Sequence, residues 1–319
     1  MVFYSLHLFA GIGGGILADV ALGVRTVGAV ENDKFCRSVL LSRQASRCLP
    51  FFPLWDDVRS FRRDNSSTSA FIDCLRSIRE NLIISGGFPC QDISPAGSRK
   101  GINGEKSGLW SEFSRIVCEI RPALVFVENS SELVRNGLSK VVTDFAALGY
   151  SFCWGIIPAS AVGAFHLRRR FWGVACSYSY LQHCQEFFQF VATKTKIPRL
   201  AKFCRALSDS RFKRSAGLLW QQAAYCATSS PYREGEKSDG SRQRREFKPG
   251  VGGMVDGFSR WLDEFGYFDP SELGLERIVD NCKDRTNKLR ALGNAQVPAC
   301  AAFAFCVLLS RLCFFNGGF

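Results

Sequence analysis

The sequence predicts an α/β fold, in which a largely parallel sheet carries helices on both faces. Short apolar runs alternate with helical stretches from residue 5 to about residue 175. A glycine-rich turn joins the first predicted strand to the first predicted helix. Glu31, Cys90 and Glu128 each lie just past an apolar run, and in a parallel sheet such positions share one edge.

The composition is that of a globular protein with a substantial core, since 46% of the 319 residues are hydrophobic and 22% are charged. The fourteen cysteines include no C-x-x-C pair, and no His or Cys cluster has metal-ligand spacing. We therefore expect reduced thiols, a cytosolic compartment and no metal. The apolar stretches at 2–30 and Ala299–Leu309 are expected to be buried rather than targeting or membrane segments, because the first lacks a basic start and the second is too short.

Positive charge is concentrated in one part of the chain. The net charge is +12, and the segment Cys176–Arg260 holds 15 Lys and Arg against 7 Asp and Glu. Such an excess is typical of a protein that binds a polyanion, usually nucleic acid. A solvated basic surface is the alternative interpretation.

The first predicted unit is a strand over Ser5–Phe9, a turn over Ala10–Gly15 and a helix over Ile16–Leu22. Backbone N–H groups and a helix N-terminus meet at such a turn, which favours a bound ligand. The dinucleotide fingerprint G-x-G-x-x-G is not met, because position 16 is Ile.

An acidic residue follows the second predicted strand. Val27–Val30 ends at Glu31, which lies 20 residues after the first glycine of the turn, a distance at which acids commonly bind ribose hydroxyls. Together the turn and the acid predict a nucleoside-bearing cofactor. A short third strand near Phe51–Leu54 leads to Asp57, which either contacts an adenine or caps a helix, and residues 62–70 read as a polar loop.

A thiol follows the fourth predicted strand, Leu82–Ile84. Gly86 and Gly87 are expected to end this strand, and Pro89 stiffens the backbone directly before Cys90. The turn lies at the end of the sheet where ligand crevices form. Cys90 is therefore either a nucleophile or one more small buried hydrophobic residue.

The middle of the chain continues the alternation. Residues 94–108 contain four glycines and mixed charges, which is typical of a functional lid or a disordered segment. A helix is predicted over Leu109–Ile120, a strand over Ala123–Val127 ending at Glu128, and a helix over Glu132–Leu148.

Two further strands, Phe152–Ile157 and Phe171–Ala175, flank the basic run His166–Arg170. Arginines at a strand end are also common in salt-bridged sheet edges. Beyond Cys176 the alternation weakens, and a turn is predicted at Gly293-Asn294 before the apolar terminal helix.

Taken in order, these segments resemble the cytosine carbon-5 DNA methyltransferases of bacterial or phage type. The resemblance covers residues 1–175 and about 285–319. The matching motifs are F-A-G-I-G-G at 9–14, G-G-F-P-C-Q at 86–91, Glu128-Asn129, His166-x-Arg168-x-Arg170, and G-N-A-Q-V-P at 293–298. His7 stands where the family usually has Asp, His166 replaces Gln, and Arg169 lies where an acid is frequent.

The resemblance implies a domain organisation. Residues 1–176 would form a Rossmann-like, S-adenosylmethionine-dependent methyltransferase domain, 177–284 a smaller target-recognition domain, and 285–319 a segment that completes the catalytic domain. It also implies duplex DNA as the partner, a role in restriction-modification, no membrane association, a monomeric state and a place in the cytoplasm of a bacterial cell or phage-infected host.

The resemblance also assigns the site residues. Cys90 would attack carbon 6 of a flipped-out cytosine, Glu128 would neutralise charge on ring nitrogen 3, and Arg168 and Arg170 would hold the carbonyl side. Glu31 would bind the ribose and Asp57 would lie near the adenine of S-adenosylmethionine. The full set of expected cofactor residues is Phe9, Ala10, Gly11, Gly13, Gly14, Glu31, Asn32, Asp57, Pro89, Asn294 and Ala295.

Three alternatives differ in class. An RNA cytosine methyltransferase of the same fold would share the motifs, and a methylation assay on duplex DNA against RNA would separate the two. A catalytically inactive DNA-binding relative would bind cofactor without turnover, although the intact Cys90 and Glu128 argue against it. A nicotinamide dehydrogenase is disfavoured because Ile16 breaks the dinucleotide fingerprint.

Overall fold

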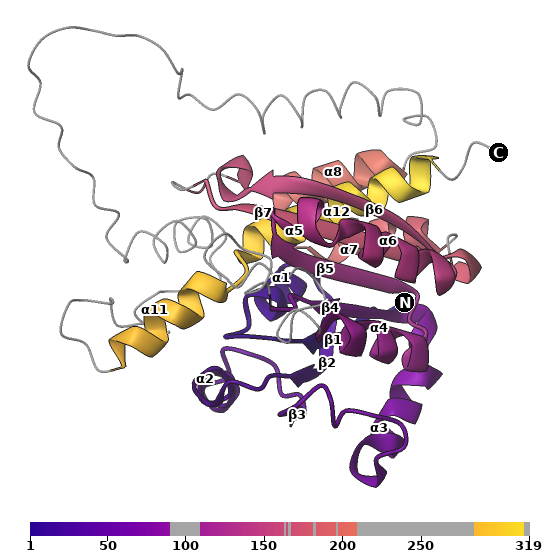
Figure 1. Cartoon of the computed structure of the whole chain (residues 1–319). Helices are drawn as coiled ribbons and strands as arrows, with labels where there is room; N and C mark the ends of the chain where they lie inside the picture. The colour runs from indigo at the N-terminus through magenta and orange to yellow at the C-terminus, as the bar shows by residue number, and fades with distance from the viewer. Residues whose placement is uncertain are drawn as a thin grey trace, which may run out of the picture.

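The computed structural model describes residues 1–89, 109–162, 164, 167–180, 183–195, 197–208 and 284–315. At its centre is a seven-stranded sheet with the order β3-β2-β1-β4-β5-β7-β6 (Figure 1). Strands β1 to β5 pair in parallel, and β7 is antiparallel to both of its neighbours. The strands are β1 (Tyr4–Leu8), β2 (Arg25–Val30), β3 (Leu54–Trp55), β4 (Leu82–Gly86), β5 (Leu124–Ser130), β6 (Tyr150–Pro158) and β7 (Arg169–Ser177). The α/β fold expected from the sequence is confirmed.

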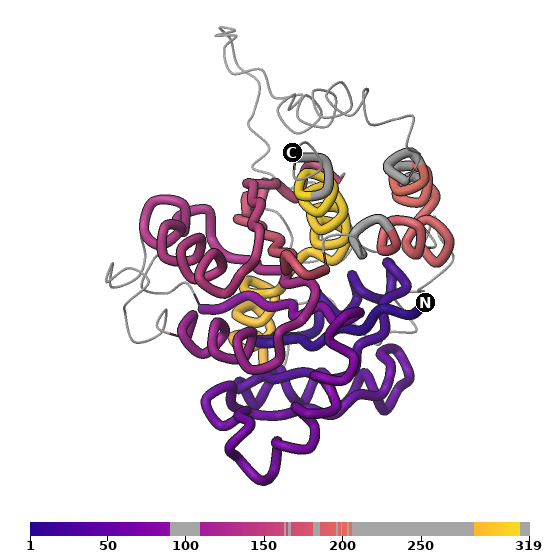
Figure 2. The backbone as a smooth tube through the Cα atoms, turned by 90° about the vertical axis from the view of Figure 1, so that its right-hand side faces the viewer, coloured from indigo at the N-terminus to yellow at the C-terminus, as the bar shows by residue number. Residues whose placement is uncertain are grey.

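Helices cover both faces of the sheet. Two successive residues of a strand point to opposite faces, and in β5 Phe126 packs with α1 and α12 while Val127 packs with α4 and α6. Figure 2 shows α12 (yellow) and α7–α8 (salmon) apart from α4–α6 (magenta). The helices are α1 (Gly14–Leu22), α2 (Lys34–Ala45), α3 (Ser66–Ser77), α4 (Leu109–Ile120), α5 (Leu133–Asn136), α6 (Leu138–Ala147), α7 (His183–Lys194), α8 (Pro198–Ser208), α11 (Arg285–Asn294) and α12 (Pro298–Phe315).

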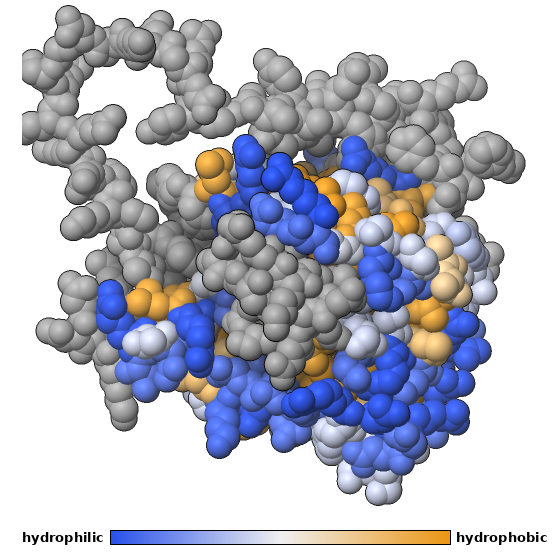
Figure 3. Space-filling view, in the orientation of Figure 1, coloured by the Kyte–Doolittle hydropathy of each residue, from blue (hydrophilic) through white to orange (hydrophobic). Residues whose placement is uncertain are grey.

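The core helices have apolar inner faces and polar outer faces. Helix α4 buries Trp110, Phe113 and Ile116 on one stripe, and the Trp110 ring stacks on Phe113 at 5.5 Å. The Trp110 indole N–H donates to Asp144 Oδ2 over 2.7 Å, so the buried ring keeps a polar partner. In the view of Figure 3 the described surface is predominantly hydrophilic, as expected for the solvent side of amphipathic elements.

Helices α7 and α8 pack on the same hydrophobic core as the sheet, beyond the expected domain boundary at residue 177. Phe187 of α7 is fully buried, and its ring lies 4.9 Å from Phe3 and 5.1 Å from Phe305. Leu200 and Cys204 of α8 are buried in the same cluster. In the sequence, basic residues obscured the apolar spacing of these helices. Because α8 ends at residue 208, any separate domain would start after it. Residues 209–283 lie outside the described part of the chain.

Local structure departs from the sequence predictions at three places. The expected polar loop at 62–70 gives way to α3 at Ser66, because the Asn65 side chain accepts from Ser67 N over 3.0 Å and caps the helix. The expected helix 132–148 is divided at Gly137 into α5 and α6. Gly293-Asn294 is the last turn of α11 rather than a loop, and the break comes at Ala295, before Pro298 opens α12.

The C-terminal helices contain one segment that is long and apolar enough to cross a membrane. It spans Arg285–Leu312, and its most apolar 18-residue window has a mean hydropathy of 1.7 and is 61% buried inside the protein. Helix α12 packs against α1, β6 and β7. The buried terminal helix expected at Ala299–Leu309 is therefore present and is longer than expected.

Candidate active site

The site forms where the chain reverses its direction of progress across the sheet. From β1 the next strands add outward through β2 and β3, whereas β4 lies on the other side of β1 and leads to β5. Ligand crevices in open α/β sheets form at this point, beyond the carboxyl ends of the strands. A hollow lies there, lined by His7, Leu8, Phe9, Ala10, Gly11, Gly15, Gly86, Gly87, Glu128, Asn294, Ala295 and Gln296.

The turn after β1 is held by Glu31. Its Oε2 accepts from Gly11 N over 2.6 Å, and its Oε1 accepts from Asp33 N over 2.8 Å. Gly11 and Phe9 both have positive φ values, of 56° and 54°, and a left-handed backbone is easy for glycine but uncommon for Phe. Burial raises the pKa of Glu31, and the two backbone hydrogen bonds oppose that shift. Each carboxylate oxygen keeps a further lone pair for a ligand hydroxyl.

The C-terminal segment closes against the helix that follows this turn. A Cβ on Gly14 would lie 2.3 Å from the carbonyl oxygen of Gln296, so only glycine permits this approach. Arg290 of α11 forms a 2.7 Å ion pair with Asp33, whose side chain also caps α2. Gly15 and Gln296, which are 281 positions apart in sequence, therefore line the same hollow.

A buried pair lies behind the turn. His7 Nε2 and Asp19 Oδ2 are 2.5 Å apart, and the two residues are only 3% and 7% exposed. The sequence marked His7 as a departure from the family pattern, but it gave no sign that α1 supplies an acid to it.

Glu128 is the buried acid at the end of β5. It is 8% exposed, and Arg170 Nε lies 3.2 Å from its Oε1. Burial raises the pKa of Glu128 to about 7, while the positive charges of Arg170 and Arg168 act in the opposite direction. Near neutral pH the protonated carboxyl, which can donate a proton, and the carboxylate anion are therefore both populated.

The turn after β4 is fixed to β5 by Asn129. Its side-chain Nδ2 donates to the Phe88 carbonyl over 3.1 Å, and the residue is 2% exposed. A Cβ on Gly87 would lie 2.7 Å from Glu128 Oε2, so the acid lies directly against the turn. Cys90 follows Pro89 at the end of this turn and lies outside the described residues, so its role stays a prediction.

Arg168 has a different environment from the one expected. Its guanidinium donates to the carbonyls of Gly293 over 2.7 Å and Ala295 over 2.6 Å, and its φ is 28°. Burial is the main cause that lowers its pKa, with Arg170 adding to the effect. Arg168 therefore anchors the C-terminal segment, whereas Arg170 is the arginine beside Glu128.

The expected cofactor residues are brought to one edge but are not equally placed. Phe9, Ala10, Gly11, Asn294 and Ala295 line the hollow, whereas Gly13, Gly14, Glu31, Asn32 and Pro89 are not among the residues that line it. Asp57 is held by Arg59, whose Nε and Nη2 donate to both carboxylate oxygens over 2.7 to 3.0 Å. This pair lowers the pKa of Asp57, and its role toward an adenine stays a prediction.

Three further site residues were not assigned from the sequence. Gln296 lines the hollow, Asn129 ties the catalytic turn, and Asp19 pairs with His7. The motifs G-N-A-Q-V-P and Glu-Asn signalled the first two. Asp19 could be found only as the polar interruption of an otherwise apolar helix. Among the described residues, no group of three or more His, Cys, Asp or Glu could hold a metal ion.

Comparison with known proteins decides the family. The model of the C-5 cytosine-specific DNA methylases matches residues 3–246. The chain belongs to this family. Among its curated members, the type II methyltransferase M.CviJI of Paramecium bursaria Chlorella virus IL3A is 31% identical over 187 residues, which are 56% of this chain and 45% of the relative. M.HhaI of Haemophilus parahaemolyticus is 30% identical over 169 residues, 52% of this chain and 46% of the relative.

A solved structure supports the fold over nearly the whole length. The S. pombe Dnmt2 methyltransferase has a TM-score of 0.55 and 16% sequence identity, and the match covers 97% of this chain and 99% of that one. At this identity the likeness concerns the fold alone. The chain spans about half the length of the curated DNA methylases that it matches.

Proposed function

We propose that this DNA methylase family member transfers a methyl group from S-adenosylmethionine to carbon 5 of a flipped-out cytosine in duplex DNA. The observation that carries the proposal is the position of Glu128, a buried acid with a pKa of about 7 that lies against the turn before Cys90. Cytosine carbon 5 needs activation before it accepts a methyl group. A thiol and a proton donor at one edge of the sheet supply that activation.

The hollow after β1 fits the proposed cofactor. Its walls combine the apolar Phe9 and Leu8 with a glycine turn whose backbone approaches closely, and Glu31 offers carboxylate oxygens suited to ribose hydroxyls. The buried Gln296 Oε1 has no hydrogen-bond partner within the described chain, which suits a polar ligand nearby. S-adenosylmethionine supplies an electrophilic methyl group.

The first chemical step belongs to Cys90 and Glu128. The Cys90 thiolate forms a bond to ring carbon 6, and the electron pair of the 5,6 double bond is displaced toward ring nitrogen 3. The protonated Glu128 donates a hydrogen bond or proton to that nitrogen. Arg170, next to Glu128, stabilises the developing charge on the carbonyl side. Carbon 5 then becomes the nucleophile that takes the methyl group, while the bond from that methyl group to sulfur would break and leave its electron pair on the sulfur of S-adenosylhomocysteine.

The last step restores the ring. A base removes the proton from carbon 5, the 5,6 double bond re-forms, and the bond between carbon 6 and the Cys90 sulfur breaks to release the thiolate. Cysteine suits both ends of this cycle, because its thiolate is a strong nucleophile and a good leaving group. The base is not assigned to a residue of this chain.

Duplex DNA is the proposed substrate, and the target cytosine must leave the stack to reach the edge of the sheet. We propose that the basic part of the chain, with an excess of eight positive charges between Cys176 and Arg260, provides phosphate affinity. Residues 209–283 are the proposed target-recognition segment.

A trapping experiment tests the proposal. Duplex DNA that carries 5-fluorocytosine cannot lose a proton from carbon 5, so the protein with S-adenosylmethionine should form a stable adduct that maps to Cys90. The variant Cys90→Ala should form none, and Cys74→Ala, which removes an exposed thiol outside the hollow, should behave like the wild type. An adduct on another cysteine, or adducts formed with RNA but not with DNA, would reject the proposal as stated.

A further inference from the structure

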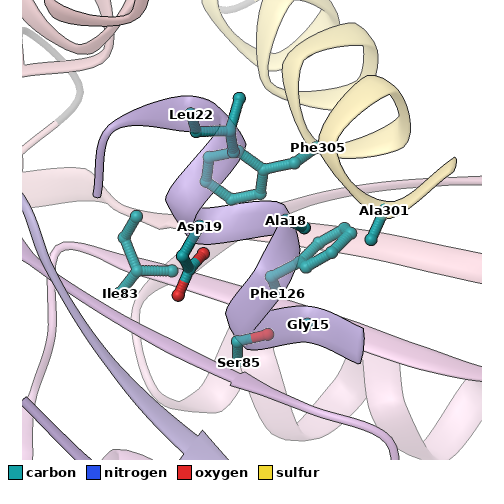
Figure 4. A pocket seen from close by; sticks show the side chains of 9 residues that line it. All are labelled: Gly15, Ala18, Asp19, Leu22, Ile83, Ser85, Phe126, Ala301 and Phe305. Carbon is teal, nitrogen blue, oxygen red and sulfur yellow. The ribbon is translucent and has the colours of Figure 1, made fainter. Parts of the chain in front are cut away.

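The carboxylate of Asp19 is buried in a largely apolar part of the core. Figure 4 shows it on α1, near Ile83 and Ser85 of β4 and below Phe305 of α12. A carboxylate in such a place needs a strong polar partner. His7 is that partner, with Nε2 at 2.5 Å from Oδ2.

The side chains of His7 and Gln296 both approach Gly15. The position that a Cβ on Gly15 would occupy lies 2.7 Å from Gln296 Oε1, 3.0 Å from His7 Cε1 and 3.1 Å from His7 Nδ1. The two side chains therefore converge on one point, and glycine at residue 15 is what leaves that point open. Gln296 Oε1 is buried there with no hydrogen-bond partner in the described chain.

The far end of the Gln296 amide points toward the catalytic turn. A Cβ on Gly87 would lie 3.6 Å from Gln296 Nε2 and 2.7 Å from Glu128 Oε2. One side chain thus extends from the helix that follows the cofactor turn to the turn that precedes Cys90. Both turns line the same hollow.

We propose that Asp19, His7 and Gln296 form one positioning unit, in which Asp19 orients the His7 ring beside Gly15, and the Gln296 side chain, which approaches Gly15 from the C-terminal segment, extends from the turn Phe9–Gly15 to the turn Gly86–Gly87. The role of this unit rests on the proposed function: it holds the turn Phe9–Gly15, which would bind the cofactor, in a fixed position relative to the turn Gly86–Gly87, which precedes Cys90. His7 in this chain is then part of a working arrangement with Asp19, and not a defect of the site.

If the three residues act as one unit, the effects of their substitutions should not be independent. Residues with separate structural roles would instead show independent effects. Asp19 contacts Nε2 of His7, and Gln296 approaches Gly15 beside the same ring, so their substitutions should be coupled only if the ring transmits the effect. Asp19→Asn and Gln296→Met, which nearly keep side-chain volume, should each speed amide exchange in residues 9–15 of the protein without cofactor. We expect amide exchange about tenfold faster than in the wild type for each single variant. For the double variant we also expect about tenfold, rather than a hundredfold. That deficit equals a coupling free energy of about 1.4 kcal/mol.

A control variant separates this coupling from a general loss of stability, and a second cycle is available if one variant does not fold. Thr26→Val removes the buried hydrogen bond with Ser5, two residues before His7 on the same strand face, and should leave exchange in residues 9–15 unchanged. Should Asp19→Asn fail to fold, His7→Asn combined with Gln296→Met completes the same cycle. Multiplicative effects, or equal acceleration in β2 and β5, would overturn the proposal.

Calorimetry with S-adenosylhomocysteine then tests the consequence for the ligand. Each single variant should weaken binding about tenfold, and the double variant should weaken it no further. Wild-type protein that failed to bind this compound would contradict the proposed function, while the exchange cycle would still decide whether the positioning unit exists. Unchanged affinity in both single variants would reject its role toward the cofactor.

Discussion

Gly87 and Glu128 are packed so closely that a side chain at residue 87 would displace the Glu128 carboxyl. A Cβ at this position would lie 2.7 Å from Glu128 Oε2, a separation that real Cβ atoms essentially never show. The acid at the end of β5 and the turn at the end of β4 therefore hold each other in place. In the proposed mechanism, the turn before Cys90 and its proton donor are therefore in contact before any substrate arrives.

Gly87→Ala is expected to impair chemistry far more than folding. The new methyl group would push the Glu128 carboxyl out of position, and loss of one such donor typically costs about 100-fold in rate. Single-turnover methylation of duplex DNA measures this. Gly155→Ala is the matched control, since its Cβ would lie in ordinary contact with Leu308 Cδ2 at 3.6 Å. A Gly87→Ala rate near that of the wild type would contradict the assigned role of Glu128.

Arg170→Ala should move the alkaline limb of the pH–rate profile to higher pH. Arg170 lowers the pKa of Glu128, so its removal raises that pKa above about 7 and keeps the donor protonated further into the alkaline range. The maximum rate should fall at the same time, because the positive charge beside the cytosine carbonyl is lost. Arg169→Ala, at an exposed neighbouring position, should leave the limb in place. A limb that moves to lower pH in Arg170→Ala would contradict this arrangement.

Glu128→Gln should change how stability depends on pH. The folded-state pKa is raised from 4.5 to about 7, so the folded state binds this proton more tightly than the unfolded state. The resulting stabilisation is complete below pH 4.5 and is lost as pH rises to 7, up to about 3 kcal/mol. The variant has no carboxyl at this position to titrate. Its unfolding free energy should therefore increase relative to that of the wild type as the pH rises from 4.5 to 7. Denaturant titrations at several pH values measure the difference, and the exposed Glu80→Gln should show none.

Much of the fold follows from local sequence signals. Apolar runs placed the strands, Pro122 and the amphipathic stripe gave α4 its observed bounds, and the ends of the runs placed Glu31 and Glu128 at one edge. These features depend on residues near one another in the chain. The sequence predicted them because burial and helix geometry dominate locally.

The remaining features depend on contacts between distant segments. The sequence gives no local sign that Arg168 donates to carbonyls at residues 293 and 295, or that Gln296 meets Gly14 and Gly15. The sequence likewise gives no local sign that the apolar face of α7 packs on Phe3 and Phe305. Basic residues near α7 and α8 gave a competing signal, which moved the expected domain boundary.

Phe187→Ala tests whether α7 belongs to the catalytic core. The Phe187 ring is fully buried between Phe3 of the N-terminal segment and Phe305 of α12, so its truncation should leave a cavity and cost about 3 to 5 kcal/mol of unfolding free energy. The loss should appear in the single cooperative transition of the catalytic core, read from the near-ultraviolet signal of Trp110 and Trp172, which are both buried there. The exposed neighbour Glu186 offers the control Glu186→Ala, for which surface substitution predicts a change within about 0.5 kcal/mol. A separate domain from residue 177 onward would instead melt in its own transition, and Phe187→Ala would then leave the tryptophan signal of the core unchanged.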